Sequence, residues 1–220
     1  MGSDPVTANR ESRSASREPR RIGVLISGRG SNLQALIDAV AAKTLQAQIA
    51  LVISNNSDAA GLDRARAAGI ETRVLDHRSF SSRDEYDSAV AQELQARGVS
   101  VVCLAGFMRL IGPRLLEAFP NAILNIHPSL LPAFPGVNAQ RQALDHGVKM
   151  TGATVHLVTG ELDGGPIVVQ APVPVRDDDT VDILSARILI EEHRLYPEAV
   201  RIVLDRRWRL EGRRFLRLPE

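Results

Sequence analysis

The chain has 220 residues, 44% of them hydrophobic, which is enough for one sizeable core. Its 27 basic and 26 acidic side chains give a net charge of +1, which argues against nucleic acid or a membrane surface as a partner. The single cysteine, Cys103, excludes an internal disulfide and a cysteine-rich zinc site. Residues 1–20 are polar, with no apolar stretch for a signal peptide, so we interpret them as a disordered extension of a cytoplasmic protein whose single domain is residues 21–220.

Short apolar runs alternate with helical patterns in the first part of the domain. The runs predict strands at residues 22–27, 49–54, 72–76, 101–107 and 122–127. Helices are predicted at 32–43 and 59–68, and from a capping box at Ser82 and Glu85 to residue 97. Because the strands are continuously apolar, they indicate a Rossmann-like α/β fold, with a mostly parallel sheet covered by helices on both faces.

The pattern changes after residue 150. Residues 153–159 and 167–173 flank a turn-rich segment and predict a hairpin, so the sheet should end in antiparallel strands. A long helix is predicted over residues 180–206, and the final stretch WRLEGRRFLRL suggests a small second hairpin.

The sequence SGRGSN at residues 27–32 joins the first strand to the first helix. Glycines allow a tight turn, and a helix N-terminus offers free N–H groups, so the loop suits a phosphate monoester. It is not a complete dinucleotide fingerprint, because Leu33 stands where a third glycine would, and it lacks the Gly-Lys-Ser/Thr of a triphosphate loop. The alternative is a tight turn without a ligand.

The segment ILNIHP at residues 123–128 places Asn125 and His127 on one face of a strand end. In parallel sheets, ligands bind beyond the carboxyl ends of the strands. An amide donor beside an imidazole suits acyl transfer, since one can stabilise an oxyanion and the other can move protons. The alternative is a turn cap beside a structural histidine.

Two further polar residues lie near the predicted hairpin. Asp163 precedes two glycines, which is common turn chemistry, so a purely structural role stays open. His156 has apolar neighbours along its strand and is interpreted as structural. The histidines show no metal-ligand spacing, so no metal site is predicted.

Taken together, these motifs resemble the glycinamide ribonucleotide formyltransferase family. The matching stretches are spread over residues 22–205: VLISGRGSNLQALIDA, LAGFMRLIGP, LNIHPSLLPAFPG, TGATVHLV, ELDGGPIVVQ and EEHRLYP. The resemblance implies transfer of a formyl group from 10-formyltetrahydrofolate, as co-substrate, to the amine of glycinamide ribonucleotide in purine biosynthesis. It also implies small-molecule partners only, no metal, and a monomer or homodimer.

The resemblance further implies roles for individual residues. Asn125, His127 and Asp163 match the catalytic trio of the family, in which the amide holds the oxyanion and the carboxylate pairs with the histidine. The expected ribonucleotide contacts are Gly30, Ser31, Asn32 and Glu192, and the expected folate contacts are Arg83, Met108, Arg109, Leu110, Ile111 and Asn125. The chain departs from the family pattern at Leu189, usually polar or basic, and at residues 137–140, which often include a histidine.

Four other functions are weighed against this expectation. A formyltetrahydrofolate hydrolase would carry an N-terminal regulatory domain that the short tail cannot form. A methionyl-tRNA formyltransferase would add a C-terminal domain and a basic surface for RNA. A sugar-nucleotide formyltransferase usually lacks the SGxGSN loop. A catalytically silent nucleotide-binding module would not need the intact trio Asn125, His127 and Asp163.

Overall fold

A computed structural model describes residues 20–219 of the chain. Arg20, expected to close the N-terminal extension, is instead the first residue of a strand, and the rest of that predicted extension lies outside the described residues. Among the described helices, none combines the length and the apolar character that crossing a bilayer requires.

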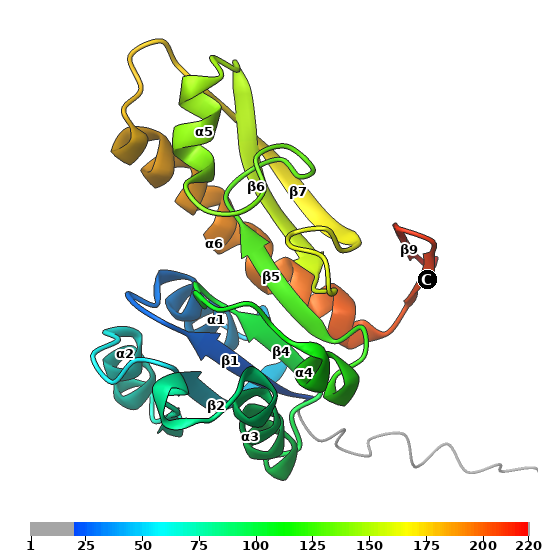
Figure 1. Cartoon of the computed structure of the whole chain (residues 1–220). Coiled ribbons are helices and arrows are strands. Elements are labelled where there is room, and N and C mark those ends of the chain that lie inside the picture. The colour runs from blue at the N-terminus through cyan, green and yellow to red at the C-terminus, as the bar shows by residue number, and fades with distance from the viewer. Residues whose placement is uncertain (1–19, 220) are drawn as a thin grey trace, which may run out of the picture.

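The fold is built on a seven-stranded sheet with the order β3-β2-β1-β4-β5-β6-β7 (Figure 1). Pairing is parallel from β3 to β5 and antiparallel in β5–β6 and β6–β7. The strands are β1 (Arg20–Ile26), β2 (Ala47–Ser54), β3 (Thr72–Val74), β4 (Val101–Leu104), β5 (Ile123–His127), β6 (Met150–Leu157) and β7 (Ile167–Pro174).

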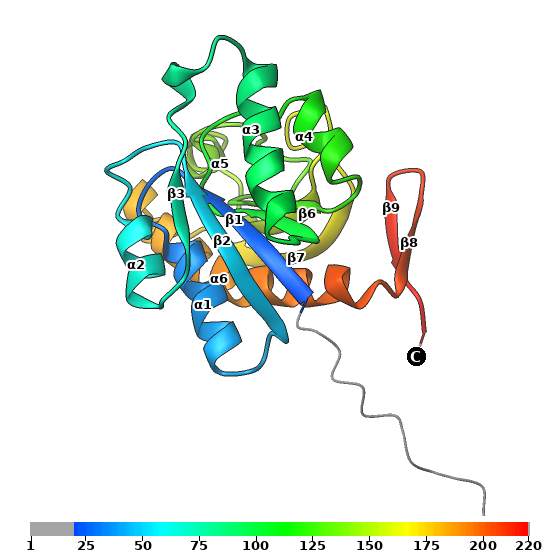
Figure 2. The same cartoon turned by 90° about the horizontal axis from the view of Figure 1, so that it is seen from below.

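Helices cover both faces of the sheet. The helical elements are α1 (Ser31–Ala41), α2 (Gly61–Ala67), η1 (His77–Ser79), α3 (Arg83–Ala96), α4 (Pro113–Ala118), α5 (Ala139–Asp145) and α6 (Val181–Asp205). Residues of α1, α2 and α6 pack in one apolar cluster, whereas α3 and α4 pack in a second cluster against the opposite side of the strands. After α6, β8 (Trp208–Glu211) and β9 (Arg214–Arg217) form a separate two-stranded hairpin at the end of that helix (Figure 2).

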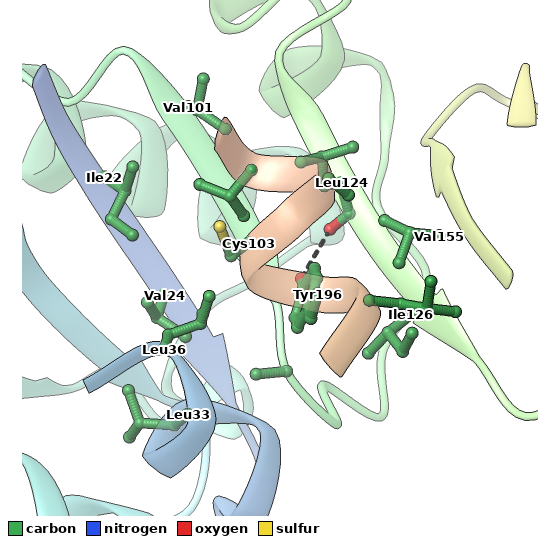
Figure 3. Packing of buried hydrophobic residues seen from close by; sticks show 14 of the residues in the cluster. Ile22, Val24, Leu33, Leu36, Val101, Cys103, Leu124, Ile126, Val155 and Tyr196 are labelled. Atoms are coloured by element: carbon green, nitrogen blue, oxygen red, sulfur yellow. Dashed lines mark hydrogen bonds between the residues drawn. The ribbon is translucent and has the colours of Figure 1, made fainter. Parts of the chain in front are cut away.

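The larger cluster is organised around α6. Tyr196 is fully buried, and its hydroxyl lies 2.9 Å from the carbonyl oxygen of Leu104 and 3.1 Å from that of Leu124. Figure 3 shows the contact with Leu124 among the apolar side chains of β4 and β5. The hydroxyl therefore ties the central helix to two adjacent strands.

The predicted fold class is confirmed, and both predicted hairpins are present. Two short helices, α4 and α5, were not predicted, and β4 ends at Leu104 rather than at residue 107. The Ser82 hydroxyl accepts from the backbone N–H of Glu85 as predicted, but the Glu85 carboxylate accepts from the N–H of Ser81 at 2.7 Å instead of completing the box on Ser82.

Candidate active site

The loops after β1 and β4 meet at the carboxyl edge of the sheet. In the sheet, β2 lies beside β1 on one side and β4 lies beside it on the other. The order in which the strands are added therefore reverses between β1 and β4. Such a reversal opens a crevice between the two loops in open α/β sheets. The Ser27 N–H donates to the carbonyl of Gly106 at 3.2 Å, and the Met108 N–H donates to Ser27 Oγ at 2.8 Å. These bonds join the two loops directly.

Asn125 and His127 project from the end of β5 on the face opposite Leu124 and Ile126, which belong to the α6 side of the core. The antiparallel register places Asn125 directly across from His156 of β6. Asn125 Nδ2 consequently lies 3.2 Å from His156 Nε2. Cross-strand neighbours in an antiparallel pair are close enough for such contacts, so the register itself assembles this part of the site.

Asp163 lies in the turn between β6 and β7 and contacts this group. Its Oδ1 is 3.4 Å from Asn125 Nδ2 and 3.6 Å from His156 Nε2. Its Oδ2 is 3.4 Å from His127 Nδ1 and accepts the backbone N–H of Gly136 at 2.8 Å. The structure therefore brings Asn125, His127 and Asp163 together, with His156 as a fourth member.

The second nitrogen of His127 also has a partner. Nε2 lies 2.8 Å from the carbonyl oxygen of Phe134, and a carbonyl can only accept. With a carboxylate at Nδ1 and a carbonyl at Nε2, an imidazolium would find an acceptor for each of its N–H groups. Both ring nitrogens of His127 thus face hydrogen-bond acceptors.

The environment also favours the charged form of Asp163. Burial by itself raises the pKa of this carboxyl, because it penalises the charge. The hydrogen bonds with His156 and with the Gly136 N–H, and the charges of His127 and His156, outweigh that effect and hold the pKa below its usual value of 3.8. The cluster therefore combines a carboxylate, an imidazole pair and an amide in one place.

The loop expected to hold phosphate leads directly into α1. Gly30 adopts a left-handed φ of 71°, and a Cβ there would lie 2.6 Å from the Cα of Gly61 in α2. Glycine is therefore required at this position by local packing. Gly28 has no neighbour within 4 Å of a Cβ position, so the loop is open on that side. Ser31 begins α1 and is half-buried.

Two of the expected ribonucleotide contacts touch each other. Asn32 Nδ2 donates to Glu192 Oε2 at 2.7 Å, and both residues are 8% exposed. Burial raises the pKa of Glu192, and the hydrogen bond from Asn32 only partly opposes that shift. The Asn32 Oδ1 atom is buried without a protein partner, so a polar group of a ligand could be satisfied there.

Most of the residues expected to contact folate follow β4, on the other side of the crevice expected at this edge. Met108 and Leu110 are exposed apolar side chains, at 77% and 56%, whereas Ile111 packs on the α3 side of the core. The Arg109 guanidinium lies 5.2 Å from the centre of the Tyr86 ring, within cation–π range. Arg83 begins α3 and lies beside Gly112, where a Cβ would approach its side chain to 3.0 Å.

Sequence reasoning missed two parts of the site. His156 was interpreted as structural, yet it contacts Asn125 and Asp163, and only the β5–β6 register would have indicated this. The Phe134 carbonyl is a backbone group and carries no residue-type signal. The two departures from the family pattern fall at the half-buried Leu189 of α6 and around the start of α5 at Ala139.

Residues 20–200 match the formyl transferase family. The chain is 46% identical to the phosphoribosylglycinamide formyltransferase of Escherichia coli (strain K12) over 189 residues, which is 86% of this chain and 89% of that protein. The chain belongs to the formyl transferase family. A crystal structure of glycinamide ribonucleotide transformylase 1 from Symbiobacterium toebii is similar to it, with a TM-score of 0.92 and 54% identity over 95% of this chain and 99% of that chain.

This formyl transferase also matches one part of larger proteins. It is 49% identical over 183 residues to the human trifunctional purine biosynthetic protein adenosine-3, and the match spans 83% of this chain but 18% of the human protein. All residues of the polar cluster lie inside the family match, whereas the hairpin β8–β9 lies beyond it.

Proposed function

We propose that this formyl transferase moves the formyl group of 10-formyltetrahydrofolate to the amine of glycinamide ribonucleotide, giving N-formylglycinamide ribonucleotide and tetrahydrofolate. The observation that carries the proposal is the Asn125, His127 and Asp163 cluster at the carboxyl edge of the sheet, in a chain 46% identical to the E. coli phosphoribosylglycinamide formyltransferase. The step belongs to de novo purine biosynthesis.

The two walls of the crevice take different substrates in this proposal. The ribonucleotide phosphate binds at Gly30, Ser31 and Asn32, where free N–H groups at the start of α1 favour an anion. The Glu192 carboxylate binds the ribose hydroxyls. The folate lies along the opposite wall, against Arg83, Asn125 and residues 108–111, where the exposed apolar side chains would cover its rings.

Attack of the amine on the formyl carbon creates a tetrahedral intermediate with a negative oxygen. The Asn125 amide carries two N–H bonds, so it can donate one to this oxygen while the other stays within the polar cluster. Loss of one such donor typically raises a barrier by about 3–4 kcal/mol.

Proton movement is assigned to His127 and Asp163. The His127 imidazolium adds positive charge beside the oxyanion and supplies a proton towards the folate nitrogen as the carbon–nitrogen bond breaks. Asp163 balances that charge at 3.4 Å and organises the loss of a proton from the attacking amine. This chemistry requires neither a metal ion nor a covalent intermediate. We place the enzyme in the cytoplasm, as a monomer or homodimer acting on small molecules.

The proposal is tested by measuring formyl transfer from 10-formyltetrahydrofolate with three acceptors: glycinamide ribonucleotide, water alone and charged initiator tRNA. We expect turnover only with the ribonucleotide, and His127→Ala should remain folded but lose most of it. Comparable release to water or transfer to tRNA would contradict the proposal, and near-parental turnover by a folded His127→Ala variant would remove His127 from the mechanism.

A further inference from the structure

The C-terminal hairpin reaches the turn that carries Asp163. Arg213, at the tip between β8 and β9, has its Nη1 atom 3.2 Å from Glu161 Oε2. Its Nη2 atom donates to the carbonyl oxygen of Gly164. One guanidinium thus contacts both ends of the 161–164 turn. A planar fork of N–H donors is well suited to bridging two oxygens in this way.

The turn has an unfavourable backbone conformation at the residue that matters most. Asp163 has a φ of 48°, in the left-handed region that non-glycine residues seldom occupy. Within the turn, the Gly164 N–H donates to the Glu161 carbonyl at 3.3 Å. Aspartate is among the few non-glycine residues that enter this region, and a residue held there depends on its surroundings to keep the conformation. Arg213 is a contact from outside the turn that helps to hold this conformation.

The hairpin is anchored firmly enough at its base to act as a support. Trp208 Nε1 donates to the carbonyl of Val203 at 3.1 Å, and its ring stacks on Phe215 with centroids 4.7 Å apart. Both rings pack against the core that contains α6. Arg217 reaches Glu198 of α6 at 3.4 Å. The tip bearing Arg213 is therefore held in a defined place relative to the sheet.

We propose that Arg213 is a positioning residue for formyl transfer, which holds the 161–164 turn so that the Asp163 carboxylate faces Asn125 and His127. This inference rests on the proposed function. The Arg213 side chain is 69% exposed, and exposed ion pairs contribute little to global stability. Its loss should therefore change turnover far more than it changes unfolding.

The test compares Arg213→Ala and Arg213→Lys with a control from the same hairpin, Arg209→Ala. Arg209 is 61% exposed and pairs with Glu211 at 2.6 Å, so its removal costs the hairpin a similar ion pair without touching the turn. Because a small misplacement of a catalytic group can cost up to ~100-fold, we expect kcat to fall about tenfold in Arg213→Ala, with both KM values and the melting temperature close to parental. Arg213→Lys should recover part of the loss.

A pH profile separates positioning from a merely structural effect. When the turn loosens, Asp163 loses its burial, which raises the pKa, together with the hydrogen bonds and histidine charges that outweigh it. The net effect is that the Asp163 pKa returns upwards towards 3.8, so the acid limb of kcat should move to higher pH. Glu161→Gln removes the charged partner while leaving the hairpin intact and should shift the profile in the same direction.

Parental kcat and pH profile in both Arg213→Ala and Glu161→Gln would overturn the inference, as would an equal loss in Arg209→Ala. Failure of the parent protein itself to formylate glycinamide ribonucleotide would instead overturn the proposed function.

Discussion

Asp163 is the residue through which the polar groups of the candidate site meet. Its two oxygens contact an amide, two imidazoles and a backbone N–H. The sequence predicted Asn125 and His127 as a pair, because strand periodicity places alternate residues on one face. Periodicity could not bring Asp163 to them, because the path of a turn across a sheet depends on tertiary packing, and only the family resemblance placed Asp163 in the trio. Asp before two glycines is equally typical of an ordinary turn.

The substitution Asp163→Asn separates these two readings of the residue. Asparagine tolerates the left-handed region, so the turn with its φ of 48° should be retained and the melting temperature should stay close to parental. The carboxylate charge beside His127 is lost, so the proposed mechanism predicts that turnover falls by roughly 100-fold or more, while substrate binding changes little. Steady-state kinetics and thermal melts measure both effects. If Asp163→Asn keeps the turnover of the parent protein, Asp163 has only a structural role in the turn.

At the scale of elements, length influenced what the sequence could predict. The strands gave short apolar runs and the longer helices α1, α3 and α6 gave periodic patterns, and these elements were predicted within a few residues of their bounds. α4 spans 6 residues and α5 spans 7, so their apolar spacing repeats too seldom to identify them by periodicity, although α2, which also spans 7 residues, was predicted. The sequence does not show which residues of β5 and β6 lie opposite each other. His156 was therefore interpreted as structural, although the register pairs it with Asn125.

The connection between β7 and α6 is closed by an ion pair whose effect on stability depends on pH. Arg187 contacts Asp179 through both carboxylate oxygens at 2.7 Å. The hydrogen bonds from the Arg187 side chain and the Arg176 N–H lower the pKa of Asp179 from 3.8 to about 2. A carboxyl whose folded pKa is lowered stabilises the fold above its unfolded pKa, and this contribution is lost as the pH falls through the folded value.

We therefore expect Asp179→Asn to lower the urea midpoint at neutral pH, and the difference from the parent protein to shrink as the pH falls from 3.8 to about 2. The measurement is urea unfolding of parent and variant at several pH values across this range. Asp178→Asn is the matched control, because the neighbouring Asp178 is exposed and should change the midpoint little at any pH. A difference that stays constant down to pH 2 would contradict the assignment.

For the whole molecule, the candidate site depends on the order of the strands. Alternating strands and helices predicted a parallel sheet, but many strand orders share that alternation. The observed order places β1 beside β4 and β5 beside β6, which brings the loop after β1, the end of β5 and His156 of β6 to one region. α6 spans 25 residues and contacts β4, β5, β6 and β7, so it holds these strands together.

Two buried tyrosines allow the contribution of one hydroxyl group to the stability of this arrangement to be measured. The Tyr196 hydroxyl links α6 to the carbonyls of Leu104 and Leu124, whereas the Tyr86 hydroxyl is buried with no protein partner. Removing a hydroxyl that makes a buried hydrogen bond costs about 1–2 kcal/mol, but removing an unpaired buried hydroxyl is close to neutral or stabilising. Both substitutions to phenylalanine keep the ring and therefore the apolar packing.

Tyr196→Phe should accordingly lower the melting temperature by roughly 2–8 °C, since 1 kcal/mol corresponds to about 2–4 °C in a protein of this size. Tyr86→Phe should leave it unchanged or raise it slightly. Calorimetry on the parent protein and both variants gives the comparison. Equal effects in the two variants would contradict the role of the Tyr196 hydroxyl, because both would then report only the loss of an oxygen atom from a packed core. A selective effect of Tyr196→Phe would show that the contact between α6 and the strands β4 and β5, which lead to the candidate site, contributes to the global stability.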